Sequence, residues 1–440
     1  MECVYQSSCL LAVKRLRVRD LYFTSRAPPM PGCAADTFDA SGTWVSGPPS
    51  KMQALWECPI REWNLPQVHF VSRSSCRTTR NPHPDLWRDY TVDGCPRIST
   101  YDVAVPDRTI FFAGDSMAHQ HWHAFACRQL YEGMSRMGCN ETACRDRHAR
   151  PYGQPPSKNT PHIRCDKCRG FGVRYPVPMS SLIKHRAAAY AATRSPPDSA
   201  FDCVEFTLGD THQHSFRTCF MQTNLTTIRW LHRTGAARQG DALVVNSGLT
   251  ERAHDLTATL QPLARALSSL SKEGVRVLWR ETHPQHFPPV PTNLRKLDNS
   301  TTDFFIFRSG QGTGATSMYH KQMHTAYRKH GRCEPMVSLE RTPLSSRDLA
   351  LFRDAGLPII LIWGLTSTQW DVHREIFAPH PYTISALDCT HFCTPSGVME
   401  AWVDATTNAL ANRWGFVHAH GHGDRSTSGM TLRSFRNKWP

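Results

Sequence analysis

The sequence predicts an α/β fold in which helices cover both faces of a parallel sheet. Short apolar runs recur along the chain, and stretches with a helical spacing of apolar residues lie between them. This alternation is typical of parallel sheets, because each return to the sheet needs a crossover. With 440 residues, 40% of them hydrophobic and 20% charged, the chain is long enough for one large domain or two smaller ones.

The expected elements follow one another from residue 101 onward. Strands are expected at 109–113, 242–246, 275–279 and 358–363. Helices are expected from Ser116 to about Tyr131, from a cap at Asp255 to Gly274, at 346–354 and from Gly397 to about Asn412. Ser116, Asn246 and Arg280 fall at or just beyond strand ends, where parallel sheets bind ligands. We therefore expect a site at that edge of the sheet.

The N-terminal part of the chain does not share this pattern. Residues 1–30 are expected to be a poorly ordered leader, and residues 31–100 a loop-rich module. The cysteines expected to staple this module, in any of three pairings, are Cys33, Cys58, Cys76 and Cys95.

Residues 101–440 are expected to form the α/β domain that carries the site, with an irregular Cys- and Pro-rich insertion at 139–225 that shapes a groove over the sheet edge. The cysteines of the insertion are Cys139, Cys144, Cys165, Cys168, Cys203 and Cys219. The first four also suggest a zinc site, but their loose spacing in a chain that looks secretory favours disulfides.

Composition indicates the compartment and the kind of partner. The formal charge of +14 and the pI of 9.2 favour an acidic partner such as an anionic polysaccharide. Nucleic acid is not expected, because the basic residues are scattered and no recognition motif is present. Sixteen cysteines and three glycosylation sequons, at Asn140, Asn224 and Asn299, favour the secretory pathway. No membrane anchor is visible, since no apolar run reaches the roughly 20 residues of a membrane helix.

Two short motifs carry the expected chemistry. Gly114-Asp115-Ser116 directly follows the strand at 109–113, and Asp388 stands three residues before His391. A serine hydroxyl becomes a nucleophile only beside a base, and the base needs an orienting group. Ser116, His391 and Asp388 are therefore the candidate catalytic residues. The alternative for the first motif is an ordinary turn in which Asp115 caps the following helix.

Further residues around Ser116 are candidates for binding an oxyanion or the substrate. They are Gly114, Asp115, His119, Gln120, Asn246, Gly248 and Arg280. The free N–H groups at the start of the helix add to them. The histidines of His119-Gln120-His121-Trp122-His123 invite a metal interpretation, but no third ligand is evident, and ordinary histidines on a helix surface fit better. No metal and no cofactor are expected.

Five blocks resemble the PC-esterase family, in its trichome birefringence-like plant branch. They are Phe-Ala-Gly-Asp-Ser at 112–116 with Trp122, Val-Val-Asn-Ser-Gly at 244–248, the block 280–287, Asp-Val-His at 371–373, and Asp-Cys-Thr-His-Phe-Cys at 388–393 with Trp402. Residues 42–45, Cys58-Pro59 and Trp87 are similar to the Cys-rich N-terminal module of that branch. The resemblance covers about residues 33–415.

The resemblance implies an SGNH-like fold and O-acetyl transfer to a cell-wall polysaccharide in the Golgi lumen, from an acetyl donor such as acetyl-CoA. It implies that Ser116 takes the acetyl group while Asp388 orients the base His391. The chain departs from the family at His119 and Gln120, where Arg and Asn are usual, and at 249–251, where His-Trp-Trp is usual. His286 and His373 match family blocks and are structural candidates.

Two other functions are compatible with the same residues. An acetylesterase uses the same triad, and differs only in letting water reach the acyl-enzyme. A polysaccharide-binding protein without activity is the second alternative, if His119 in place of Arg weakens the oxyanion site.

Overall fold

The computed structural model describes a large part of the chain. The described residues are 39, 42–46, 88–95, 97–137, 145–146, 163–164, 171–175, 177, 202–208, 214–222, 225–246, 259–286, 333, 335–336, 339–341, 343–373, 391–392 and 397–412. All of them belong to one compact unit, Gly32–Asn412. The leader expected at 1–30 lies outside the described residues, as do Cys33, Cys58, Cys76 and the helix cap expected at Asp255.

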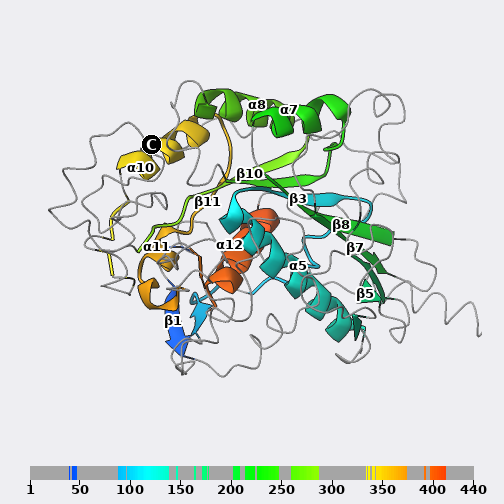
Figure 1. Ribbon diagram of the computed structural model, residues 1–440, viewed down its shortest axis with the longest axis horizontal. Coiled ribbons are helices and arrows are strands. Elements are labelled where there is room, and N and C mark those ends of the chain that lie inside the picture. The colour runs from blue at the N-terminus through cyan, green and yellow to red at the C-terminus, as the bar shows by residue number, and fades with distance from the viewer. Residues whose placement is uncertain are drawn as a thin grey trace, which may run out of the picture. The chain divides into compact units, whose positions relative to one another are not determined.

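A seven-stranded, mostly parallel sheet forms the centre of this unit (Figure 1). Its order is β11 (Ile359–Ile360), β10 (Arg276–Arg280), β9 (Ala242–Val245), β3 (Thr109–Gly114), β8 (His214–Gln222), β7 (Asp202–Leu208) and β6 (Phe171–Arg174). The first five are parallel, and β7 and β6 extend the sheet antiparallel. Counted along the chain, the parallel strands follow the doubly wound order 2-1-3-4-5, whose ligand site lies where the first and third strands meet. Here those strands are β3 and β9.

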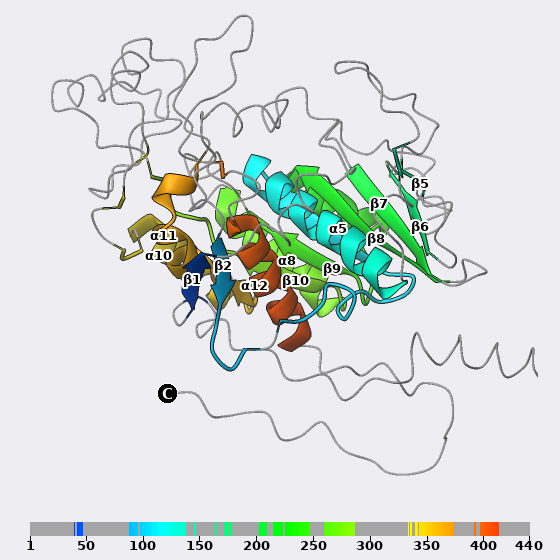
Figure 2. The same ribbon diagram turned by 90° about the horizontal axis from the view of Figure 1, so that it is seen from below.

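Helices cover both faces of the sheet, as the sequence predicts (Figures 1 and 2). On one face lie α5 (Ser116–Arg136) and α12 (Val398–Asn412). On the other lie α7 (Leu225–Thr234), α8 (Gln261–Lys272) and α10 (Pro343–Asp354). None of the helices among the described residues is both long and apolar enough to cross a membrane.

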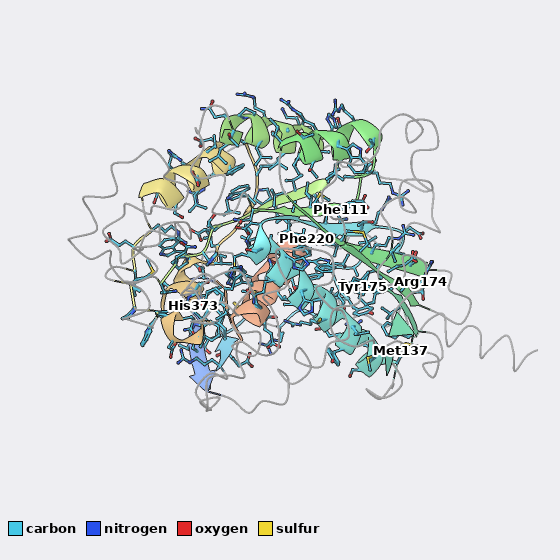
Figure 3. All side chains as sticks on the ribbon, in the orientation of Figure 1. Phe111, Met137, Arg174, Tyr175, Phe220 and His373 are labelled. Carbon is cyan, nitrogen blue, oxygen red and sulfur yellow. A yellow bond between two sulfur atoms is a disulfide. The ribbon has the colours of Figure 1, made fainter. Side chains whose placement is uncertain are left out.

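Alternate residues of β3 build two cores, one on each face. Phe111 belongs to the cluster that includes Leu231 of α7 and Leu263 of α8. Phe112 points the other way, where its ring packs 5.1 Å from that of Phe125 on α5. Figure 3 labels Phe111 together with Phe220 of β8, whose ring faces α5. Burial on both faces explains why β3 is an unbroken apolar run.

The strand expected at 358–363 is much shorter in the structure. β11 ends at Ile360, and Trp363 already begins the short helix α11 (Trp363–Ser367). The N–H groups of Ile362 and Trp363 donate to one carboxylate oxygen of the buried Glu281, at 3.1 and 3.0 Å. These two N–H groups bond to the carboxylate and not to a neighbouring strand, so the strand ends before them. The apolar character of residues 358–363 could not predict this early end.

The sequence predicts an irregular insertion at 139–225, and this prediction is wrong because the segment contributes strands to the main sheet. It contains β4 (Arg145–Asp146), β5 (Ile163–Arg164) and three strands of the main sheet, β6, β7 and β8. A disulfide between Cys203 and Cys219 joins β7 to β8. Charged residues interrupt the apolar pattern by which these strands could be recognised in the sequence. Glu205 is buried in β7, where its carboxylate accepts a hydrogen bond from Arg217 at 2.9 Å. Cys95, Cys127 and Cys333 are also disulfide-bonded.

A two-stranded antiparallel sheet within residues 31–100 packs on α11. It consists of β1 (Thr43–Ser46) and β2 (Arg88–Thr91). The indole of Trp44 donates to the carbonyl of Leu365 at 3.0 Å, and Asp39 accepts from the Leu365 N–H at 3.0 Å. Arg88 is ion-paired with Asp371 in the 3₁₀ helix η6 (Trp370–Val372). These contacts connect the module to the segment that leads into the candidate site.

A carboxyl group at the start of α12 gives the fold a pH dependence. Burial raises the pKa of Glu400 to about 7, with Asp404 and Asp89 adding to the rise and Arg128 and Arg97 opposing it. A folded-state pKa above the ordinary value contributes stability at low pH, which is lost as the pH rises through about 7. The wild type should therefore lose stability between pH 5 and pH 8 relative to Glu400→Gln. Because Glu400 is partly exposed, we expect a difference of about 1 kcal/mol by urea unfolding at the two pH values. Equal pH dependence in both proteins would contradict this expectation.

Candidate active site

Ser116 is the first residue of α5, directly after the central strand β3. The chain turns from strand to helix in two residues, and Gly114 permits this close approach. A Cβ atom on Gly114 would lie 2.2 Å from the Cβ of Ala118 and 3.1 Å from the carbonyl oxygen of Asn246. The role of Gly114 is therefore steric: it lets α5 start against β9.

Asp115 caps α5. Its carboxylate accepts from the N–H groups of Met117 and Ala118, at 3.0 and 3.3 Å. The helix cap that the sequence left as an alternative is thus present, one residue before Ser116. In the part of the chain that the structure describes, the Ser116 N–H makes no hydrogen bond. This donor at a helix N-terminus is suited to an anionic oxygen.

The imidazole of His391 lies against the hydroxyl of Ser116, although 275 residues separate them in the chain. The distance from Nε2 to Oγ is 2.8 Å, within reach for proton transfer. Both residues are partly exposed, so solvent and small molecules can reach them. Asp388, the expected orienting residue, lies outside the described residues. The structure therefore brings together the two residues that the sequence suggests as nucleophile and base.

Gln120 holds the loop that carries His391. Its amide Nε2 donates to the carbonyl of Phe392 at 2.7 Å, and its Oε1 accepts from the N–H of Phe392 at 3.4 Å. Gln120 is 2% exposed, so it positions the base rather than contacting a substrate. The sequence placed Gln120 at the site but with a different role.

Removing this clamp should lower the rate without unfolding the protein. We expect Gln120→Met to reduce kcat about 10- to 100-fold with little change in KM, because a small displacement of His391 misaligns proton transfer. Gln129→Met is the matched control, since Gln129 is also buried on α5 but bonds to Thr218 of β8. Acyl-transfer rates of both variants, with thermal midpoints, check the expectation. Equal rates in the two variants would contradict the role of Gln120.

His119 and His121 of α5 are core residues, so the helix-surface position expected for them is wrong, while His123 is partly exposed. His119 is 1% exposed and packs between Trp122 and Phe220, so it contacts no substrate. His121 is equally buried beside Thr406, and burial together with the charge of Arg280 lowers its pKa well below the usual value. Among the described residues no three His, Cys, Asp or Glu side chains gather in a metal-binding arrangement.

The side-chain amide of Asn246 connects the end of β9 to the end of β10. Its amide nitrogen donates to the carbonyl of Arg280 at 3.0 Å and to the hydroxyl of Thr282 at 3.1 Å. Both amide hydrogens are thereby used. Gly248, the other expected donor of this block, lies outside the described residues.

Arg280 places a positive charge beneath the start of α5. Its side chain is 1% exposed, donates to the carbonyl of Met117 at 3.4 Å, and lies 4.5 Å from the ring centre of Trp402. Burial lowers the pKa of Arg280 to about 10, against the influence of Asp115. Arg280 is therefore still charged at neutral pH, and its field favours negative charge near Ser116.

No protein-family model matches this chain, and no curated protein matches it either. The function must therefore be inferred from the site itself.

The sequence marked His286 and His373 separately but gave no sign that they meet. In the structure they are in contact beside His391, at 2.7 Å between ring nitrogens. The motif Asp-x-His at 371–373 indicated His373 alone, and the block 280–287 indicated His286 alone. Their pairing depends on η6 lying against the loop after β10, which only the tertiary structure decides.

Proposed function

We propose that this protein is a polysaccharide O-acetyltransferase of the PC-esterase type, with an SGNH-like fold and Ser116 as nucleophile. One observation carries the proposal: Nε2 of His391 lies 2.8 Å from Oγ of Ser116, at the start of α5. The site occupies the junction of β3 and β9, where doubly wound sheets bind ligands. The motif blocks around both residues supply the reaction class.

The reaction has two half-steps. Ser116 Oγ attacks the carbonyl carbon of the acetyl donor while His391 Nε2 takes the hydroxyl proton. The bond to the leaving group breaks, and His391 returns the proton to that group. A sugar hydroxyl then attacks acetyl-Ser116, His391 takes its proton, and the acetyl ester forms on the sugar as the Ser116 hydroxyl is restored.

The tetrahedral intermediate of each step carries an oxyanion that needs donors. The Ser116 N–H and the N-terminus of the 21-residue helix α5 meet this need. The buried charge of Arg280 adds to them. The family's Arg after the serine is His119 here, but His119 lies in the core. His119 therefore adds no donor to the site, and in this proposal Arg280 supplies the nearby positive charge.

The acceptor proposed is an acidic cell-wall polysaccharide, and the compartment is the secretory pathway, in the Golgi lumen. The formal charge of +14 favours an anionic glycan. The disulfide between Cys203 and Cys219, with the other bonded cysteines, supports an oxidising compartment.

The test is to incubate the purified protein with acetyl-CoA or an activated acetyl ester and a panel of neutral and acidic glycans. Mass spectrometry should detect an added acetyl group on the glycan and a transient one on Ser116. Acetate release measured with and without glycan separates the transferase from the esterase. Glycan binding without acetyl transfer or acetate release would overturn the proposal in favour of a non-catalytic binding protein.

A further inference from the structure

Two buried histidines form a chain of hydrogen bonds that ends at the backbone of His391. His286 Nδ1 lies 2.7 Å from His373 Nε2, and the two residues are 1% and 4% exposed. At the outer ends, His286 Nε2 donates to the carbonyl of Ser367 at 3.0 Å, and His373 Nδ1 donates to the carbonyl of His391 at 3.1 Å. Figure 3 labels His373, which lies near α11.

Counting hydrogens shows that this chain needs one more proton than two neutral rings hold. A carbonyl oxygen only accepts, so His286 Nε2 and His373 Nδ1 must each carry a hydrogen. The contact between His286 Nδ1 and His373 Nε2 needs a third, because two lone pairs at that distance repel. Two neutral imidazoles have two N–H groups between them. The arrangement is therefore that of a pair with a net charge of +1.

The groups around the pair act on this proton in opposite directions. Burial lowers the pKa of His286 to about 4 even though the Ser367 carbonyl and the Asp371 carboxylate raise it, so the shared proton needs a further favourable contribution. Asp371 is in turn ion-paired with Arg88 of β2, at 3.1 Å from Nη1. The bond between the rings also favours the proton, because it exists only while the proton is bound. His391 is a further ionisable residue in contact with the pair.

The pair fixes the segment that presents the base. The ring of His373 stacks on that of Phe392 at 4.2 Å, and the two residues form an isolated β-bridge. Gln120 of α5 clamps the backbone of Phe392 from another element. His391 is thus held through its own carbonyl and through its neighbour, and the 2.8 Å bond to Ser116 depends on both.

We propose that His286 and His373 share one proton and act together as positioning residues for His391. The inference rests on the proposed function only in taking His391 as the base for Ser116. Strand β2 is connected to the histidine pair, because its Arg88 is ion-paired with Asp371, which raises the pKa of His286.

The first test observes the proton directly. Nitrogen NMR of histidine-labelled protein at pH 6 should show three protonated nitrogens among the four of His286 and His373, with a far-downfield proton between the rings. His286→Gln keeps a donor for the Ser367 carbonyl and should lose that resonance while staying folded. His232→Leu, on the distant helix α7, should retain it. Two neutral rings at pH 6 would overturn the shared proton.

The second test measures the effect on Ser116 with a fluorophosphonate, which labels activated serines whatever their natural acyl donor. We expect His373→Leu to label about 10- to 100-fold more slowly than wild type. His373→Asn should stay within a few-fold of wild type, because its amide keeps a donor near the position of Nδ1. Equal labelling by wild type and His373→Leu overturns the positioning role, as does a wild type that does not label. If wild type labels but transfers no acetyl group, the proposed function fails while this inference stands.

Discussion

Ser116→Ala should abolish acetyl transfer while leaving the fold intact. We expect a loss of about 10⁴-fold or more, because the covalent intermediate cannot form without the hydroxyl. His391→Ala should cost a similar factor, and the double variant little more, since the two residues act as one unit. Ser116 is partly exposed and its hydroxyl bonds only with His391 in the described structure, so unfolding midpoints should scarcely move.

The measurement is acetyl transfer to the best glycan of the panel, with the acetyl-serine adduct followed by mass spectrometry. Ser269→Ala on α8 is the matched control, because its hydroxyl bonds to the Arg265 carbonyl on the opposite face of the sheet. It should retain full activity. Substantial transfer by Ser116→Ala would sink the proposed mechanism.

Trp402→Ala should cause a large loss of stability, about 3–5 kcal/mol. Trp402 is fully buried on α12, and its indole donates to the hydroxyl of Thr366 in α11 at 3.0 Å. Its ring also lies beneath Arg280 and against Phe392. The truncation leaves a cavity, and it removes the aromatic face that accompanies the buried charge of Arg280.

Urea unfolding measures the loss, and two variants calibrate it. Trp402→Phe keeps most of the volume but loses the bond to Thr366, so it should cost much less. Trp279→Ala removes a buried Trp that stacks on Phe352 in the other core. It should destabilise the protein by a similar amount, yet lower serine labelling less than Trp402→Ala does. A loss below about 1 kcal/mol for Trp402→Ala would contradict the packing described here.

The sequence predicted β3, β9 and β10 well because those strands are buried on both faces. Such strands appear as unbroken apolar runs, as in 109–113 and 242–246, and helices with one buried stripe lie between them. It missed β7 and β8, because Glu205 and Arg217 pair inside an otherwise apolar surface. It predicted too long a strand for β11, because the N–H groups of Ile362 and Trp363 donate to the carboxylate of Glu281.

For the proposed site, the sequence alone predicted Ser116 and His391 as partners, since a strand–turn–helix signal and a distant histidine motif are local features, and the structure places them 2.8 Å apart. It did not determine the roles of the neighbouring residues. Gln120, Asn246 and His119 are polar residues near Ser116 in the chain or in the sheet, but their orientation depends on partners far away in sequence. Only the tertiary structure places Gln120 on Phe392, joins His286 to His373, and buries His119 in the core. The physical reason is that a hydrogen bond is satisfied by whichever partner the packing brings within about 3 Å, and local sequence does not encode that partner.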